Sequence, residues 1–432
     1  MGGQGTAGAV PCGGHRTCRN RVRLVLAAAL AMVSTRPALA EPVTSRPPAL
    51  APTPPLGWST WYGLRCAYDE KTLREVADAM AGNGLLTAGY RYLNVDDCWA
   101  IARSPGGDLL ADPKRFPSGM KALAAYVHAR GLKFGIYTSA GTTTCQRDLQ
   151  ADASRLSVGS RGHEAQDMRL FASWGVDLVK VDWCGRYETQ DGRSSYETFR
   201  DAIAATGRPM LLSICEWGYS KPWSWGKGVG QMWRIAMDTL NCWACQTDWG
   251  GIGVVTTFDR LAEVTGSGGP EGWNDPDSVM AGNGVLTHDE ARAQLSVYAA
   301  AASPLILAAD PRRLSPGQLA MVTNRRMLDI NQDSLGKPGR RVRREDGEEV
   351  WMRLLSGGRV AIAVVNRSAA SRSIPIAAAE IDRPIGAHLT GIEVWSGKPV
   401  AGNGVLRWTV PGHGAALFVL QPAASEGVRP PV

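Results

Sequence analysis

Residues 176–185 read Val-Asp-Leu-Val-Lys-Val-Asp-Trp-Cys-Gly, and this stretch decides the fold. Residues 178–181 form a short, mainly apolar and β-preferring run between two glycines, a pattern typical of a buried strand. Lys180 and Asp182 are two residues apart, so on a strand they project from the same face. The Lys180 ammonium is then expected to keep the Asp182 carboxylate ionised. Such a carboxylate can act as a nucleophile in glycosyl transfer; a structural ion pair at a strand end is the alternative.

Strand-like and helix-like segments alternate on both sides of this stretch. About eight alternations over about 280 residues predict a (β/α)8 TIM barrel for residues 55–333. A doubly wound open sheet is the alternative, but it usually has fewer repeats, and no Gly-rich phosphate loop follows the first strand. The expected strands are residues 56–61, 90–97, 133–137, 177–182, 210–215, 232–237, 272–277 and 305–308. The expected helices are residues 69–80, 121–130, 164–174, 195–205, 257–264, 289–302 and 316–323.

The sequence after the barrel changes character. Residues 338–421 contain short alternating or β-branched runs separated by Gly, Pro and Asn, which predicts a small antiparallel β-sandwich. Residues 41–54 are rich in Pro, Ser and Thr and predict a linker without packed structure. Residues 422–432 are expected to be a frayed tail.

The first forty residues have the pattern of a removable signal peptide. Four arginines precede an apolar run at residues 24–33, and Ala38-Leu39-Ala40 is a typical cleavage sequence. The apolar run is too short to span a bilayer, as is every later stretch. We therefore expect cleavage near Ala40 and a secreted protein, extracellular or periplasmic, with no membrane span.

The charge of the chain argues against a nucleic-acid partner. Residues 1–40 contain five arginines and no acidic residue, so their removal lowers the formal net charge from +7 to +2. The basic patch that nucleic-acid binding requires is then absent. The chain contains 15 Trp and only six Phe, and Trp suits stacking on sugar rings, although most are expected to pack in the core.

Seven of the nine cysteines lie beyond the signal peptide. Export permits disulfides, and an odd number leaves at least one thiol unpaired. Cys242 and Cys245 form a CxxC pattern, which could indicate a redox dithiol or half of a zinc site. No second CxxC and no His at metal spacing accompany it, so a local disulfide, or thiols near the rim of the site, is favoured.

Acidic and other polar residues recur at the carboxyl ends of the expected strands. In a barrel these ends share one face, and that face carries the chemistry. No His lies at a strand end, which disfavours a zinc site, while a site for Mg²⁺ or Ca²⁺ made of acids stays open. The remaining use of these acidic residues is to bind a sugar and to cleave its glycosidic bond with two carboxyl groups. The residues concerned are Trp61, Asp96, Asp97, Tyr137, Lys180, Asp182, Cys215, Glu216, Arg234, Asp238, Asp275 and Asp277.

Nine motifs resemble glycoside hydrolase family 27, the α-galactosidase and α-N-acetylgalactosaminidase family, and they occur in family order. Three of them are Asn-Val-Asp-Asp-Cys-Trp (94–99), Lys-Val-Asp-Trp-Cys (180–184) and Gly-Trp-Asn-Asp-Pro-Asp (272–277). The others are Pro-Pro-Leu-Gly-Trp-Ser-Thr-Trp (54–61), Arg-Phe-Pro-Ser-Gly-Met (115–120), Gly-Ile-Tyr (135–137), Cys-Glu-Trp-Gly (215–218), Trp-Arg (233–234) with Asp238, and Ile-Asn-Gln-Asp (330–333).

The resemblance implies a retaining exo-glycosidase that removes terminal α-D-galactosyl residues without a metal or cofactor. It implies Asp182 as nucleophile and Asp238 as general acid/base, with carboxyls about 5–5.5 Å apart. A structural pairing of Asp238 with Arg234 is the alternative for that residue. The implied galactose subsite consists of Trp61, Asp96, Asp97, Tyr137, Lys180, Glu216, Arg234 and Asp277. Asp96 and Asp97 would bind the 4- and 6-hydroxyls and Glu216 the 2-hydroxyl. The implied disulfides are Cys66–Cys98 and Cys145–Cys184.

Several positions depart from the family pattern, including Trp183, Ser278 and residues 146–162, 217–225 and 241–249. They flank the site, so they affect the expected preference for the leaving group more than the reaction. The alternatives are another specificity of the family, namely α-N-acetylgalactosaminidase, β-L-arabinopyranosidase or isomaltodextranase, and a galactose-binding protein without catalysis. Retention of Asp97 argues against the arabinopyranosidase, and the presence of both Asp182 and Asp238 argues against loss of catalysis.

Overall fold

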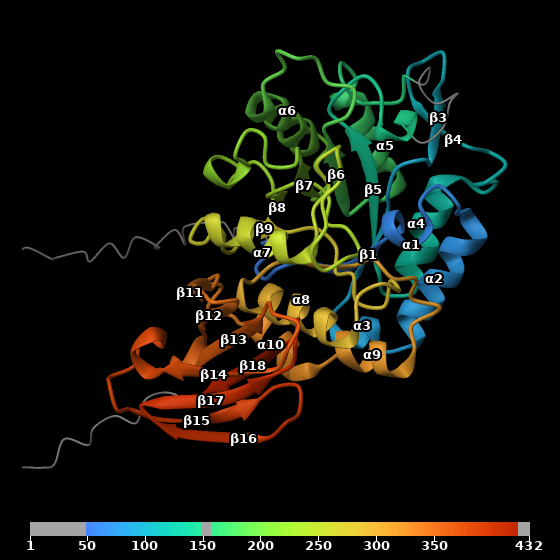
Figure 1. The fold of residues 1–432 in the computed structure, drawn as a ribbon. Helices are drawn as coiled ribbons and strands as arrows, with labels where there is room; N and C mark the ends of the chain where they lie inside the picture. Colours follow the sequence, from blue (N-terminus) through green and yellow to red (C-terminus); the bar gives the residue numbers. More distant parts are fainter. Residues whose placement is uncertain (1–48, 149–156, 422–432) are drawn as a thin grey trace, which may run out of the picture. The chain divides into compact units, whose positions relative to one another are not determined.

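Eight parallel strands form the central sheet. The computed structural model describes residues 49–148 and 157–421. The strands pair in the order β10-β1-β2-β5-β6-β7-β8-β9 (Figure 1), and a parallel bridge from Val279 to Leu307 of β10 closes the ring. The predicted TIM barrel is thus confirmed. The strands are β1 (Leu56–Ser59), β2 (Tyr92–Val95), β5 (Lys133–Ser139), β6 (Leu178–Asp182), β7 (Leu211–Cys215), β8 (Met232–Arg234), β9 (Trp273–Asp275) and β10 (Leu305–Leu307).

Helices cover the outside of the barrel because every second side chain of a strand points outward and is apolar. In β6, Val179 and Val181 belong to the large core shared with the helices, whereas Leu178 and Lys180 face the inside. The helices are α1 (Thr60–Leu64), α2 (Glu70–Gly82), α3 (Leu85–Ala88), α4 (Gly119–Ala129), α5 (Glu164–Trp174), α6 (Gly192–Ala205), α7 (Val254–Glu263), α8 (His288–Ala300), α9 (Pro316–Val322) and α10 (Arg325–Asn331).

The C-terminal strands form the predicted antiparallel sandwich. A six-stranded sheet has the order β11-β12-β13-β18-β15-β16, and β14 pairs with β17. Ile374 and Ile376 of β14 share an apolar core with Ile362 of β13 and Phe418 of β18. The strands are β11 (Arg340–Glu345), β12 (Glu348–Leu354), β13 (Val360–Asn366), β14 (Arg372–Ala377), β15 (His388–Glu393), β16 (Pro399–Asn403), β17 (Val405–Val410) and β18 (Ala415–Leu420).

Helix α8 is the element on which the sandwich packs. All but its first residues and Arg292 are buried. Arg353 of β12 is 1% exposed and donates hydrogen bonds to the carbonyls of Ala299, Ile330 and Asn331 at 2.9, 2.7 and 3.2 Å. These carbonyls lie at the carboxyl ends of α8 and α10, where a cation satisfies unpaired acceptors and interacts favourably with the helix dipoles.

The structure differs from the prediction in several short elements. A hairpin of β3 (Ala100–Arg103) and β4 (Leu109–Ala111), helix α10 and strand β16 were not expected. Each is too short to show a clear periodicity. The predicted linker is also wrong at its end, because the N–H groups of Leu50 and Ala51 donate to Glu271 at 3.1 and 2.8 Å. Ala51 is buried against the amino end of β9 and accepts a hydrogen bond from the Trp273 indole.

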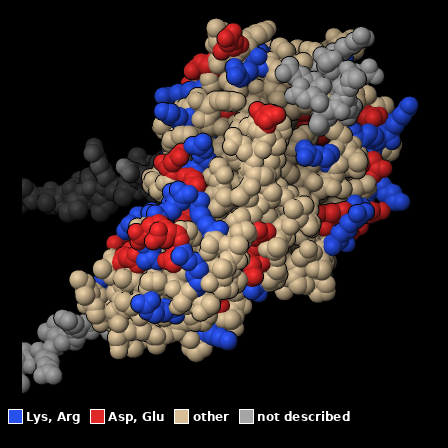
Figure 2. Space-filling view, in the orientation of Figure 1, with Lys and Arg blue, Asp and Glu red and all other residues tan. Residues whose placement is uncertain are grey.

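The surface shows both signs of charge side by side. On the face seen in Figure 2, Lys and Arg are intermixed with Asp and Glu. None of the helices in residues 49–148 and 157–421 is both long and apolar enough to cross a membrane. The expected signal peptide and C-terminal tail lie outside the described residues.

Candidate active site

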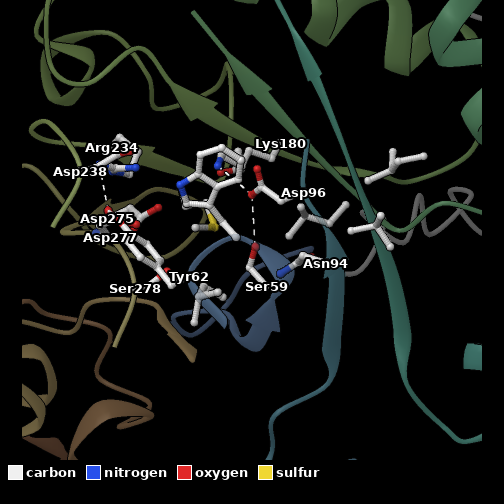
Figure 3. A pocket seen from close by; sticks show the side chains of 17 residues that line it. Ser59, Tyr62, Asn94, Asp96, Lys180, Arg234, Asp238, Asp275, Asp277 and Ser278 are labelled. Atoms are coloured by element: carbon white, nitrogen blue, oxygen red, sulfur yellow. Dashed lines mark hydrogen bonds and ion pairs between the residues drawn. The ribbon is translucent and has the colours of Figure 1, made fainter. Parts of the chain in front are cut away.

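A cavity opens inside the carboxyl ends of the barrel strands (Figure 3). Its floor contains Leu178, Met232 and Ile306, which belong to a small apolar cluster at the other end of the barrel. The upper wall is polar and comes from the strand ends and the loops after them. Six of the predicted site residues line it: Trp61, Asp96, Lys180, Arg234, Asp238 and Asp277.

One polar group in this wall is the ion pair of Lys180 with Asp96. The ammonium lies 2.8 Å from Asp96 Oδ2, and the same oxygen accepts a hydrogen bond from the Ser59 hydroxyl at 3.1 Å. Figure 3 shows Lys180 and Ser59 directed at Asp96 from two sides. Asp96 is 3% exposed, so the pair gives the cavity a fixed acceptor flanked by a cation.

The second polar group is centred on Arg234, which is buried. Its guanidinium lies 3.0 Å from Asp238 and 3.2 Å from Asp277. The Tyr62 hydroxyl donates to Asp277 at 2.6 Å, and the Thr239 N–H donates to the same oxygen at 2.8 Å. Burial raises the pKa of Asp238, and the charge of Asp277 adds to the rise, although Arg234 opposes it. The pairing of Asp238 with Arg234, which was the alternative for this residue, therefore exists, but Asp238 also lines the cavity.

Asp182 ends β6, and its environment corrects the prediction made from Lys180. Burial is the largest cause of a rise in the pKa of Asp182 to about 6, and the charges of Asp238 and Asp96 add to it. Lys180 opposes this rise, but its hydrogen bond goes to Asp96. Lys180 and Asp182 share a face as predicted; however, side chains two apart on a strand are separated by about 6.6 Å along the chain. The ammonium instead pairs with a carboxylate that follows β2, two strands away in the sheet.

Asp182 is held by local contacts. The Trp183 N–H donates to Asp182 Oδ1 at 3.0 Å, and Cys145 Sγ lies 3.3 Å from Oδ2. Cys145 is disulfide-bonded to Cys184, two residues beyond Asp182. Since the charge of Asp238 contributes to the pKa of Asp182, the two carboxyls belong to one electrostatic environment.

Four predicted site residues, Asp182 among them, do not line the cavity. Asp97 accepts hydrogen bonds from the N–H groups of Cys98 and Gln146, both at 2.7 Å, and burial raises its pKa to about 7. Tyr137 is buried, with its hydroxyl 3.3 Å from Cys145 Sγ. Glu216 is fully buried; burial raises its pKa to about 7, and one carboxylate oxygen has no hydrogen-bond partner.

Five polar residues that line the cavity were absent from the catalytic pair and the galactose subsite that the resemblance implies. They are Ser59, Tyr62, Asn94, Asp275 and Ser278. The position of Asp275 at a strand end could have identified it from the sequence. Burial raises its pKa to about 6. Tyr62 had no such signal, because residues 56–61 were expected to be strand, whereas α1 begins at Thr60 and turns Tyr62 toward Asp277. Asn94 explains the glycine of the Gly-Ile-Tyr motif: a Cβ on Gly135 would lie 1.9 Å from Asn94 Oδ1.

The cysteines in the described residues form three disulfides and one free thiol. Cys66 pairs with Cys98 and Cys145 with Cys184, as the resemblance implies, and Cys242 pairs with Cys245. Cys215 is free and buried beside the guanidinium of Arg234. Burial raises the pKa of its thiol well above the ordinary value. The described residues contain no cluster of three His, Cys, Asp or Glu side chains that could hold a metal ion.

Comparisons with known proteins agree with the fold. A family model described as alpha galactosidase A matches residues 53–333, and one for the alpha galactosidase C-terminal beta sandwich domain matches residues 345–420. Alpha-galactosidase A of Cellvibrio japonicus is 42% identical over 388 residues, covering 86% of this chain and 93% of its own. Alpha-galactosidase of Cyamopsis tetragonoloba is 36% identical over 375 residues, with 86% and 87% covered. The crystal structure of alpha-galactosidase I from Mortierella vinacea has a TM-score of 0.82 at 29% identity, covering 87% of this chain and 98% of that one.

Proposed function

Because the chain belongs to the α-galactosidase family of glycoside hydrolases, we propose that it hydrolyses terminal α-D-galactosyl residues by a retaining double displacement. The observation that carries the mechanism is the pair of carboxyls, buried Asp182 and partly buried Asp238, whose charges interact at the carboxyl end of one barrel. A retaining glycosidase needs one carboxyl as nucleophile and one as acid and base.

Asp182 is the proposed nucleophile. It ends a central strand on the inward face, and its Oδ1 is fixed by the Trp183 N–H. In the first step its carboxylate attacks the anomeric carbon, the bond to the leaving oxygen breaks, and a glycosyl-enzyme forms. Water then attacks that carbon and releases Asp182. Lys180 contributes by opposing protonation of Asp182.

Asp238 is the proposed acid and base. Its raised pKa keeps a proton available for the leaving oxygen, and in the second step the carboxylate removes a proton from the attacking water. Arg234 fixes the carboxyl at 3.0 Å. About a quarter of the Asp238 side chain, 26%, is exposed, which leaves the leaving-group side open.

The remaining polar residues are proposed to bind the galactosyl ring. The Asp96–Lys180 pair offers an acceptor and a donor for the 4- and 6-hydroxyls, with Asp97 behind it. Glu216 has a free carboxylate oxygen for the 2-hydroxyl. Arg234 and Asp277 close the opposite side, and Trp61 supplies an aromatic face. Sugar specificity then depends on which hydroxyls these fixed groups can satisfy.

An anomer-resolved assay tests the mechanism. Proton NMR of the hydrolysis of nitrophenyl α-galactoside should show α-galactose first and β-galactose only after mutarotation. Asp182→Ala should lower kcat at least about a thousandfold while the fold is kept, because no other group can form the covalent intermediate. Asp177→Asn, at the other end of the same strand, is the matched control and should keep the activity.

Two results would contradict the proposal. Initial release of β-galactose would exclude retention, and substantial activity of Asp182→Ala would remove that residue from the role of nucleophile. The same assay with N-acetylgalactosaminide, arabinopyranoside and α-glucan substrates tests the specificity. We expect the galactoside to give the highest kcat/KM.

Export is a further part of the proposal. The three disulfides fit an oxidising compartment, and residues 1–40 have a signal-peptide pattern. Sequencing the amino terminus of the secreted protein should give a chain that begins near Glu41.

A further inference from the structure

The exposed aromatic rings of this protein gather on three neighbouring loops. In the described residues, the aromatic side chains classed as exposed are Tyr187, Tyr219 and Trp249, at 54%, 62% and 56% exposure. They follow β6, β7 and β8, which are adjacent in the sheet (Figure 1). Loops after consecutive strands of a barrel lie side by side on the face that carries the site. We call these three side chains the aromatic rim.

Contacts between the loops hold the turn of Tyr219 against both of its neighbours. A Cβ on Gly218 would lie 2.4 Å from the carbonyl oxygen of Ile235, so the turn that holds Tyr219 packs on the chain just after β8. A Cβ on Gly192 would lie 2.5 Å from Ser220 Oγ, so the same turn also packs on the start of α6. The guanidinium of Arg186, next to Tyr187, lies 5.6 Å from the centre of the Tyr219 ring.

Trp249 is brought back beside the proposed acid and base. The Ile252 N–H donates to the Asp238 carbonyl at 3.0 Å, and Ile252 forms a parallel bridge with Thr239. A Cβ on Gly250 would lie 3.2 Å from Met237 Cγ. The turn that holds Trp249 thus folds onto the residues around Asp238. Since the general acid protonates the leaving oxygen, the leaving group of a bound galactoside lies on this side.

We propose that the aromatic rim binds the sugar units on the leaving-group side of a galactoside. This inference rests on the proposed function. Clusters of exposed apolar surface mark binding sites more often than scattered residues do, and an aromatic face packs on the C–H face of a pyranose. Arg161 covers one face of the Tyr187 ring at 3.6 Å, which holds the ring in place with its other face available to a sugar.

Kinetic measurements on a short and a long galactoside test whether the aromatic rim binds sugar units. Trp249→Ala and Tyr219→Ala should each lower kcat/KM for galactosyl-mannotriose by about fivefold or more, the size of one lost stacking contact. The effect on kcat/KM for methyl α-galactoside, whose leaving group is methanol, should be less than about twofold. Tyr219→Phe keeps the ring and should restore most of the loss. Tyr126→Ala is the matched control, since this tyrosine on α4 also lies under arginine guanidiniums but faces the outside of the barrel.

A binding measurement separates failure of this inference from failure of the proposed function. In gels that contain galactomannan, the wild-type protein should be retarded and the Tyr187→Ala, Tyr219→Ala, Trp249→Ala triple variant should migrate freely. Equal retardation of both proteins, or an equal loss of kcat/KM on both galactosides, would contradict the proposal that the aromatic rim binds sugar. A wild-type protein that is retarded but hydrolyses neither galactoside would contradict the proposed function and still support sugar binding by the aromatic rim.

Discussion

For single residues of the site, the position on a strand could be predicted from the sequence, but the contacts and the pKa could not. The motif that contains Lys180 and Asp182 placed both on the inner face of β6, which is a matter of strand geometry. The partner of Lys180 is Asp96, which is far away in the sequence but follows a strand only two positions away in the sheet. Burial then outweighs the effect of Lys180 on the pKa of Asp182. Strand position follows from local sequence, whereas the protonation of a buried carboxyl depends on every charge around it.

The pKa of Asp182 predicts the acidic limb of the activity. Since the nucleophile must be ionised, kcat/KM should fall as the pH drops through about 6, the raised pKa of Asp182. Lys180→Met removes the charge that opposes this rise, so the limb should move to higher pH. Asp275 also has a pKa raised to about 6, and Asp275→Asn is therefore the control. A pH–rate profile whose limb disappears in Asp275→Asn, or stays in place in Lys180→Met, would contradict the assignment to Asp182.

Whole elements were predicted well where they are long or strongly patterned. Helix α5 agrees with the expected residues at both ends, because its periodicity is clear and Gly175 follows it. Helix α10 was missed because Asn324 caps it directly after α9, so the two short helices leave almost no connecting loop. The β3–β4 hairpin and β16 are stabilised by pairing with a partner strand, which no single short run of sequence reveals.

The packing of β12 on α8 and α10 gives a prediction about stability. Arg353→Met should lower the free energy of unfolding by about 2–4 kcal/mol, because it leaves buried helix-end carbonyls without donors. Urea unfolding followed by Trp fluorescence measures the change. Arg359→Met removes an ion pair of a side chain that is 36% exposed and should cost less than about 1 kcal/mol. Equal effects of the two substitutions would show that the helix-end contacts of Arg353 contribute little.

For the molecule as a whole, the buried carboxyls of the site set how stability varies with pH. The pKa values of Asp97 and Glu216 are raised to about 7 and those of Asp182 and Asp275 to about 6. Between the ordinary carboxyl pKa, about 4, and these values, the folded chain binds more protons than the unfolded chain. The free energy of unfolding therefore falls as the pH rises through this window.

We expect Tm to be higher at pH 5 than at pH 7.5 by at least roughly a few degrees. Carboxyls such as Asp69 and Asp333, whose pKa values are lowered by hydrogen bonds, act in the opposite direction only below about pH 4. Calorimetry across pH 4–8 measures the profile. Glu216→Gln should make the decline above pH 5 shallower, and a variant with an unchanged slope would show that this carboxyl does not contribute.

The contacts of Leu50 and Ala51 with Glu271 and Trp273 anchor the beginning of the folded chain at the amino ends of the strands. The cavity mouth lies at the carboxyl ends. A resin or a carrier protein attached ahead of this anchor would therefore hold the enzyme by its base, with the mouth turned toward a polymer in solution. Attachment through the loops after β6, β7 or β8 would instead place the support where a long glycan has to approach.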